Sequence, residues 1–191
     1  MNRNDFTARK IERPVQWLRV FCLYRRAFPR SERKPFRMIY SMWRRGKTDI
    51  WCFEQAGRFA GFAATINGSS LILLDYLAVQ EEMRDRGIGS HALDHLKESY
   101  RDRGLFVEIE NAFAAGYDQP ERMRRRGFYL KNGMRPSRVM ARVFGVEMEL
   151  LCWNCRVDFP AYRAFYRDHY NAWAAEHILA AAYPDAPEDF C

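Results

Sequence analysis

Long apolar runs are absent from this sequence. No stretch approaches the roughly 18 consecutive apolar residues that identify a membrane-spanning helix. The charged first ten residues, MNRNDFTARK, contain no apolar segment of the kind found in secretory signals. We therefore expect a protein that does not associate with membranes and that resides in the cytoplasm.

Cysteine is scarce and irregularly spaced, with five residues in a chain of 191. An odd, scattered set argues against the disulfide framework of a small secreted protein. The segment CWNC at 152–155 has CxxC spacing, but neither the βαβ context of a redox motif nor the second ligand pair of a zinc site is visible. We expect reduced thiols with a structural role, and no cysteine lies in a motif that indicates an acyl-enzyme. The five are Cys22, Cys52, Cys152, Cys155 and Cys191.

A metal-binding set is also missing from the sequence. His91 and His95 lie one helical turn apart, as zinc ligands can, but the sequence places no acidic or cysteine partner beside them. The chain has neither the Gly-Lys-Ser/Thr end of a Walker loop nor the GxGxxG spacing of dinucleotide-binding folds. We therefore expect no bound metal and no nucleotide site of these two types.

What the chain does contain is typical of a soluble globular domain. Apolar residues make up 48% of the sequence and charged residues 29%, whereas disordered chains are poorer in apolar residues. The length of 191 residues suffices for one domain with a sizeable core, so we predict a single domain over 1–191. The net charge of +7 and the pI of about 9.3 permit binding of a polyanion but do not require it.

Much of the positive charge falls between residues 25 and 47, around two expected helices. Such a cluster is typical of a solvated helical face, and it also suits recognition of an acidic acceptor or of nucleic acid. The sequence leaves these alternatives open, with nucleic acid the less favoured partner. The basic residues are Arg25, Arg26, Arg30, Arg33, Lys34, Arg37, Arg44, Arg45 and Lys47.

The order of the expected elements indicates an α/β fold with a mixed sheet. Apolar or alternating runs bounded by glycine turns favour strands, and apolar residues at helical spacing favour helices. The predicted strands span 6–12, 50–55, 58–66, 71–79, 105–110, 138–144 and 146–153. The predicted helices span 15–28, 36–43, the segment from Gly87 to Gly104, about 120–131 and about 161–182.

The stretch over 71–100 combines three local signals. Leu71–Val79 is almost uninterruptedly apolar, with Asp75 as the exception, which suits a strand covered on both faces. The chain then runs through Gly87-Ile88-Gly89 into an amphipathic helix. Such a junction directs backbone N–H groups and the positive end of a helix dipole at one spot, so it favours an anion. Two arginines on the approach favour phosphate. The alternative is an ordinary tight turn with solvated arginines.

This junction resembles a known acyl-CoA-binding motif. The GNAT N-acyltransferase superfamily has an Arg/Gln-x-x-Gly-x-Gly/Ala sequence after a strand. It is similar to Leu77-Ala78-Val79 followed by Arg84-Asp85-Arg86-Gly87-Ile88-Gly89, and the chain resembles the bacterial-type members of this superfamily. The resemblance implies that the turn holds the pyrophosphate of CoA and that backbone N–H near Val79 stabilises the thioester oxyanion. The implied CoA-binding residues are Leu77, Ala78, Val79, Arg84, Asp85, Arg86, Gly87, Ile88, Gly89 and Ser90.

The resemblance covers about residues 5–155 and also implies a fold. This is a mixed, mostly antiparallel central sheet flanked by helices, whose strands four and five splay apart to admit the pantetheine arm of CoA. The last predicted helix lies beyond this core, in a C-terminal helical extension over about 156–191.

A second match lies near the end of the helix at 120–131. The segment GFYLKNGM at 127–134 is similar to the Phe-Tyr-x-x-x-Gly-Phe segment of the same superfamily, with Met134 in place of phenylalanine. The resemblance implies that Tyr129 donates a proton to the departing CoA thiolate, which a phenol with its ordinary pKa of about 10 can do. The alternative is a core tyrosine. Arg122 replaces a frequent asparagine, so the arginines at 122, 124, 125 and 126 either contact the 3′-phosphate region of CoA or face water.

Acyl transfer to an amine also needs a base. Asp75 lies in the apolar strand, where an acid requires a partner or a function. Glu108 and Glu110 lie on the next strand and could act through a water. The superfamily has no fixed position for its base, so all three stay open, with Asp75 and Glu110 ranked above Glu108. Glu147 and Glu149 share one face of a later strand, where they either face solvent or attract a cationic acceptor.

The resemblance therefore predicts an acyl-CoA-dependent N-acetyltransferase with acetyl-CoA as co-substrate and no metal. It transfers an acetyl or other short acyl group to a primary amine by direct attack in a ternary complex. The alternative is a non-catalytic CoA-binding or nucleic-acid-binding module on the same fold. The sequence identifies neither the acceptor nor the acyl-chain preference, and it leaves a homodimer open.

Overall fold

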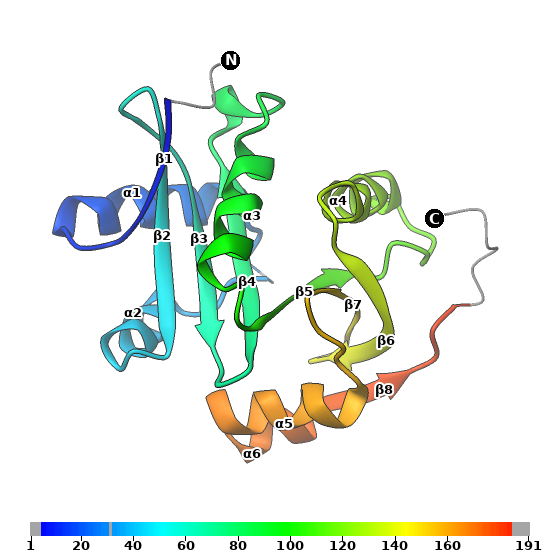
Figure 1. The fold of residues 1–191 in the computed structure, drawn as a ribbon. Coiled ribbons are helices and arrows are strands. Elements are labelled where there is room, and N and C mark those ends of the chain that lie inside the picture. The colour runs from blue at the N-terminus through cyan, green and yellow to red at the C-terminus, as the bar shows by residue number, and fades with distance from the viewer. Residues whose placement is uncertain (1–4, 31, 185–191) are drawn as a thin grey trace. The chain divides into compact units, whose positions relative to one another are not determined.

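The computed structural model describes residues 5–30 and 32–184 (Figure 1). The chain divides into two compact units, an N-terminal unit of residues 1–103 and a C-terminal unit of residues 104–191. Within each unit the paired strands are antiparallel, and each unit has its own helices. None of the helices in the described ranges combines the length and the apolarity that a membrane crossing requires. The single domain over 1–191 stays a prediction.

The sheet of the N-terminal unit has the strand order β1-β2-β3-β4, and all neighbouring strands in it are antiparallel. Ala56 and Gly57 join β2 to β3, with positive φ angles of 50° and 73°. Two left-handed residues form a hairpin turn whose twist matches that of the flanking strands. The strands are β1 (Phe6–Lys10), β2 (Thr48–Gln55), β3 (Arg58–Asn67) and β4 (Leu71–Val79).

Helices cover both faces of this sheet (Figure 1). On one face, buried side chains of α1 and α2 pack with Phe62 of β3 and Tyr76 of β4. On the other face, His95 of α3 contacts Trp51 of β2, with ring centroids 5.0 Å apart. Coverage on both sides explains why β4 is apolar almost throughout, as predicted. The helices are α1 (Pro14–Ala27), α2 (Phe36–Arg44), the 3-10 helix η2 (Glu81–Met83) and α3 (Ile88–Ser99).

The strands of the C-terminal unit follow the order β5-β7-β6-β8, and all neighbouring strands in this series are antiparallel. Arg126 of α4 pairs with Glu149 of β7, which lies opposite Ile109 of β5. The preceding residue of β5, Glu108, accepts a hydrogen bond from Tyr162 of α5. Because successive strand residues point to opposite faces, α4 and α5 cover opposite faces of β5. The elements are β5 (Gly104–Glu110), α4 (Gln119–Lys131), β6 (Arg135–Val143), β7 (Val146–Trp153), α5 (Phe159–His169), α6 (Ala172–Glu176) and β8 (Ile178–Ala181).

The predicted helix over about 161–182 is wrong in its second half. α5 ends at His169, the five-residue helix α6 follows, and residues 178–181 form β8. The side chain of Asn171 accepts a hydrogen bond from the backbone N–H three residues on, at 2.8 Å, and so begins a separate helix. β8 then pairs with β6. Its alanine-rich sequence has high helix propensity, but backbone pairing with a sheet edge overrides that preference.

The predicted α/β fold with a mostly antiparallel sheet flanked by helices is confirmed, since all strand pairs within either unit are antiparallel. The extra helix beyond residue 155 is present as α5. The predicted splay is between β4, in the N-terminal unit, and β5, in the C-terminal unit, and it stays a prediction. β6 begins at Arg135, earlier than predicted, because its pairing with β7 continues past an irregularity between Pro136 and Met140.

Candidate functional site

A strained turn connects the end of β4 to the start of α3. After Val79 the chain passes through η2, and Arg84 adopts an extended conformation with φ −64° and ψ 163°. Asp85 and Gly87 follow with positive φ angles of 59° and 74°. Glycine adopts this left-handed conformation readily, whereas aspartate does so at a steric cost. The predicted glycine turn is therefore present, with Gly87 as the N-cap of α3.

The first turn of α3 has backbone donors without helical partners. The first hydrogen bond of the helix runs from His91 N–H to Gly87 C=O at 3.0 Å, and no side chain caps the helix. The N–H groups of residues 88–90 therefore lack intrahelical acceptors at the positive end of the dipole. A Cβ added to Gly87 would meet no atom within 4 Å, so the space beside the turn is open. Arg84 and Arg86 are exposed on the approach to the turn.

The end of β4 lies unusually close to β3. Gly61 pairs with Val79, and a Cβ added to Gly61 would lie 2.4 Å from the carbonyl oxygen of Ala78. Only glycine leaves room for the backbone of the segment at 77–79, which the resemblance associates with the thioester. Sequence analysis did not single out Gly61. The available signal was a glycine inside a strand, which often marks a close backbone approach.

Asp75 has a charged partner. Its carboxylate lies 2.5 Å from Nζ of Lys34, in the segment between α1 and α2, and both side chains are largely buried. Two phenols attach the same segment to the sheet. The hydroxyl of Tyr24 donates to Lys34 C=O at 2.9 Å, and that of Tyr76 donates to Glu32 C=O at 3.0 Å. Burial raises the pKa of both phenols, so they remain protonated donors. An ion pair thus accounts for the acid in the apolar strand.

Tyr129 is buried near the C-terminal end of α4. Burial raises the pKa of Tyr129 to about 12, with a smaller opposing effect from Arg125. The phenol therefore keeps its proton at neutral pH. Its hydroxyl has no hydrogen-bond partner among the residues that the structure describes, which leaves this donor available.

Glu108 is held by two phenols from α5. The hydroxyl of Tyr162 donates to Oε1 at 2.8 Å, and that of Tyr166 donates to Oε2 at 2.9 Å. Both tyrosines are buried, and they lie four residues apart, so they project from the same side of the helix. Burial, and next the charge of Glu108, raise the pKa of Tyr162 well above its usual value. Both oxygens of Glu108 therefore accept hydrogen bonds from phenols, and the phenol of Tyr162 stays protonated.

Glu110 differs from the other two candidate bases. It lies at the end of β5, opposite Met148, and is half-buried. Within residues 5–30 and 32–184 its carboxylate has no hydrogen bond or ion pair with another side chain. It shares a face of β5 with Glu108, since the two are separated by one residue. Of the three predicted carboxylates, the described structure leaves only this one without a side-chain partner.

Neither predicted role of Glu149 fits the structure, because its carboxylate is buried and already paired with a cation of the protein. It is 0% exposed and accepts two hydrogen bonds from the guanidinium of Arg126, at 2.8 and 3.2 Å. The hydroxyl of Tyr183 donates to it as well, at 2.6 Å. Arg126 is consequently buried, so the alternative in which this arginine faces water is wrong. Glu147 is the partner of Asn111 and Arg142, both at 3.0 Å.

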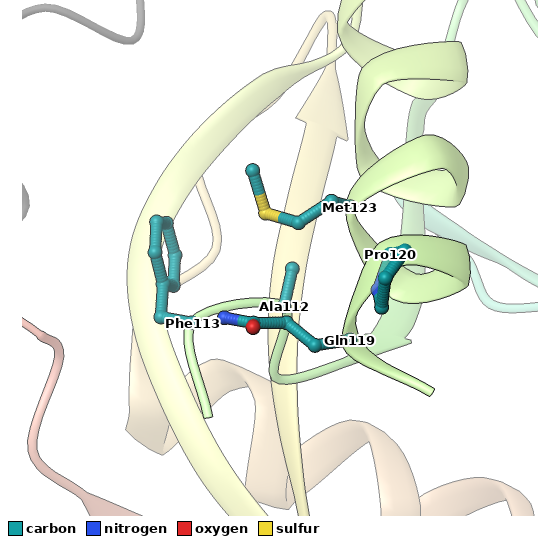
Figure 2. A pocket seen from close by; sticks show the side chains of 5 residues that line it. All are labelled: Ala112, Phe113, Gln119, Pro120 and Met123. Atoms are coloured by element: carbon teal, nitrogen blue, oxygen red, sulfur yellow. The ribbon is translucent and has the colours of Figure 1, made fainter. Parts of the chain in front are cut away.

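An open pocket of about 420 Å³ lies between the loop after β5 and the first turns of α4. Figure 2 shows Phe113 facing α4 across this pocket, with Met123 above the opening. The lining is apolar apart from one amide side chain, and it includes none of the candidate carboxylates. The residues are Ala112, Phe113, Gln119, Pro120 and Met123.

The predicted site residues fall into two groups, one in each unit. The N-terminal unit contains Asp75, the segment at 77–79 and the turn at 84–90. The C-terminal unit contains Glu108, Glu110 and Tyr129. No group of three or more metal-ligating side chains occurs within the described residues of either unit.

Comparison with known sequences places most of the chain in one family. The sequence profile of the acetyltransferase (GNAT) family matches residues 17–134, which is more than half of the chain. A search of curated proteins finds no match.

Solved structures share the fold at low sequence identity. A protein from Bacteroides thetaiotaomicron, described as a GNAT-family acetyltransferase, has 17% identity and a TM-score of 0.73, over 88% of this chain and 98% of its own. An aminoglycoside 6′-N-acetyltransferase solved with coenzyme A has 16% identity and a TM-score of 0.64, over 80% and 99%. NAA60 of Arabidopsis thaliana, solved with acetyl-CoA, has 15% identity and a TM-score of 0.61, over 78% and 97%.

Proposed function

The chain belongs to the GNAT acetyltransferase family, and from this premise we propose that it is an acyl-CoA-dependent N-acetyltransferase. It transfers an acetyl or other short acyl group to a primary amine by direct attack in a ternary complex. The observation that carries the proposal is the open first turn of α3, which lies within the family-matched residues. Similar folds have been solved with coenzyme A and with acetyl-CoA.

In this proposal the turn at 84–90 holds the pyrophosphate of CoA. The N–H groups of residues 88–90 donate to phosphate oxygens, and the helix dipole favours the negative charge. Arg84 and Arg86 add positive charge from the exposed approach. Gly87 keeps the turn free of a side chain. Backbone N–H near Val79 stabilises the oxyanion that develops on the thioester carbonyl.

Glu110 is the base in this proposal and receives the amine proton through a water. Its support is the absence of a side-chain partner among the described residues. Asp75 neutralises Lys34, and Glu108 accepts hydrogen bonds from two phenols, so both carboxylates have structural tasks. Partial burial at the end of β5 also suits a group that must be reached by a water.

Tyr129 stabilises the leaving group in this proposal. A phenol with a pKa of about 12 is a weaker acid than a thiol, whose ordinary pKa is about 8.5. Its main effect on the departing CoA thiolate is therefore a hydrogen bond, with complete proton transfer left to solvent or to a later step. An available, always protonated hydroxyl suits this task.

Calorimetric titration with acetyl-CoA tests the proposal. We expect a Kd on the order of micromolar for the wild type, and binding weaker by about tenfold or more for Gly87→Val. Gly57→Val is the matched control, because Gly57 has φ 73° against 74° for Gly87 and also lacks any atom within 4 Å of an added Cβ. Both variants incur similar backbone strain, so Gly57→Val should bind acetyl-CoA like the wild type.

A wild-type protein that shows neither heat nor a thermal shift with acetyl-CoA would refute the proposal. Nucleic-acid binding that falls steeply with salt and persists without CoA would instead support the non-catalytic module. Turnover is measured as thiol released from acetyl-CoA in the presence of primary amines.

A further inference from the structure

The outward face of α1 has an apolar centre. Val15 is 53% exposed and Leu18 is 63% exposed, and Cys22 is exposed as well. Three and then four positions separate these residues, so their side chains form one stripe along the helix. The inward face of α1, which includes Val20 and Leu23, is buried in the core of the N-terminal unit. α1 therefore has a second apolar stripe that contributes nothing to the core of its own unit.

Arginines border this apolar stripe. Arg19 and Arg26 each follow a member of the stripe by four positions, so they lie along one side of it. Both side chains are exposed, and neither has a hydrogen bond or an ion pair in the part of the chain that the structure describes. Arg25 lies seven positions after Leu18, and its guanidinium lies 5.6 Å from the centre of the Phe21 ring. The border of the stripe is thus positively charged and not neutralised from within the protein.

The positive charge continues on the neighbouring helix. α1 and α2 contain no aspartate or glutamate. α2 exposes Arg37, Tyr40 and Arg44, which share one side of the helix because three and then four positions separate them. The ring of Tyr40 contacts the ring of Trp17 on α1, with centroids 5.2 Å apart. Two helices in contact therefore present a basic surface, which favours an anionic partner.

The narrow shape of the stripe identifies the class of this partner. A helix that lies on a membrane exposes a broad apolar face, whereas residues spaced by three and four positions form the narrow seam by which two helices pair. An apolar seam also has no role in binding the phosphates of a nucleic acid. A second copy of this chain would place arginines opposite arginines, which is unfavourable. The partner that fits is a helix with an apolar seam and acidic borders.

We propose that the outward face of α1 is a docking surface for an acidic amphipathic helix of another protein. The apolar side chains of that helix pack on Val15, Leu18 and Cys22, and its carboxylates pair with Arg19 and Arg26. The surface includes none of the residues proposed to bind CoA or to take part in catalysis. The proposal therefore stands whether or not the protein is an acetyltransferase.

A designed peptide with the chemistry of the proposed partner is the probe. It has about three heptads, with leucine at positions a and d and glutamate at e and g, and the glutamates keep it from pairing with itself at neutral pH. The control peptide has lysine in place of every glutamate. Fluorescence anisotropy with the full-length protein measures the Kd. We expect a Kd on the order of 10 μM for the glutamate peptide and binding weaker by at least about tenfold for the lysine peptide.

Two variants separate the apolar and the charged parts of the surface. Leu18→Ser should weaken binding of the glutamate peptide by about tenfold or more. Leu179→Ser is the matched control, because Leu179 is 55% exposed on β8 of the other unit, and it should bind like the wild type. Arg19→Glu/Arg26→Glu should reverse the preference, so that the lysine peptide binds more tightly than the glutamate peptide. Circular dichroism verifies that each variant is folded.

A wild-type protein that binds both peptides equally, or neither of them, would overturn the proposal. So would any of three results that the glutamate peptide leaves unchanged, because each assigns the surface to another partner. The first is a homodimer in sedimentation equilibrium that Leu18→Ser dissociates. The second is binding to phosphatidylserine vesicles that Leu18→Ser abolishes. The third is binding to single-stranded RNA that Arg19→Glu/Arg26→Glu weakens and Leu18→Ser does not.

Discussion

The hydroxyl of Tyr162 donates a hydrogen bond to Oε1 of Glu108 at 2.8 Å. Tyr166, one helical turn further along α5, donates to the second carboxylate oxygen at 2.9 Å. These bonds attach a helix that lies beyond the family-matched residues 17–134 to a strand within them. α5 is therefore part of the packed C-terminal unit and not a separate appendage.

Removal of either phenol hydroxyl should destabilise the protein. We expect Tyr162→Phe and Tyr166→Phe each to lower the free energy of unfolding by about 2 kcal/mol, the usual range for a hydrogen bond to a charged group. Urea denaturation measures the effect. Tyr117→Phe is the control, because Tyr117 is fully exposed and its substitution should change stability by less than about 0.5 kcal/mol. Wild-type stability in the Tyr162 variant would show that the contact is energetically neutral.

The candidate bases can be separated by activity and stability together. Glu110→Gln should lower kcat by roughly 100-fold, the lower range for loss of a general base, and leave stability unchanged. Asp75→Asn should retain kcat within about threefold but lose roughly 2 kcal/mol of stability, since it leaves Lys34 without its charged partner. Thiol release from acetyl-CoA and urea denaturation provide the two measurements. Full activity of Glu110→Gln would show that another group acts as the base.

Tyr129 should affect turnover more than CoA affinity. We expect Tyr129→Phe to lower kcat by roughly tenfold or more while the Kd for acetyl-CoA changes by less than about threefold. Because burial raises the pKa of Tyr129 to about 12, its ionisation should cause no loss of activity below about pH 11. If Tyr129→Phe had the wild-type kcat, Tyr129 would not be the group that stabilises the departing CoA thiolate.

The raised pKa of Tyr129 also predicts how stability depends on pH. The unfolded chain loses the phenol proton near pH 10, its ordinary value, whereas the folded chain keeps it to about pH 12. The contribution of neutral Tyr129 is therefore complete below about pH 10 and is lost as the pH rises toward 12. Between about pH 9 and 11, Tyr129→Phe should lose less stability than the wild type. Urea denaturation at about pH 9 and at about pH 11 measures the two losses of stability. If the wild type and Tyr129→Phe lost the same free energy of unfolding over this range, burial of the phenol would be contradicted.

Gly61 should tolerate no side chain. An added Cβ would lie 2.4 Å from Ala78 C=O, so Gly61→Ala must separate β3 from the end of β4. We expect a loss of about 3 kcal/mol and weaker acetyl-CoA binding, because the segment at 77–79 shifts. Gly127→Ala is the control, since its added Cβ meets no atom within 4 Å on helix α4. The control should raise stability by up to about 1 kcal/mol in denaturant titrations.

Local signals in the sequence were sufficient to predict the glycine turn at 84–90. The glycine after a charged turn predicts a left-handed residue before a helix, and Gly87 has that conformation. The apolar stretch over 71–79 predicts a strand covered on both faces, and helices cover both sides of β4. Each of these features depends on residues that are close together along the chain.

Only the tertiary structure decided what the charged residues do. Asp75 has its partner 41 residues away, and Glu108 has its donors 54 and 58 residues away. Glu149 pairs with Arg126, which lies 23 residues earlier in the chain. The same limit applies to β8, whose helical sequence becomes a strand because the edge of β6 is available. Sequence spacing determines which side chains share a face, but the identity of a partner across that face depends on how distant segments pack. That is why Glu110 could be distinguished from Asp75 and Glu108 only once their partners were in place.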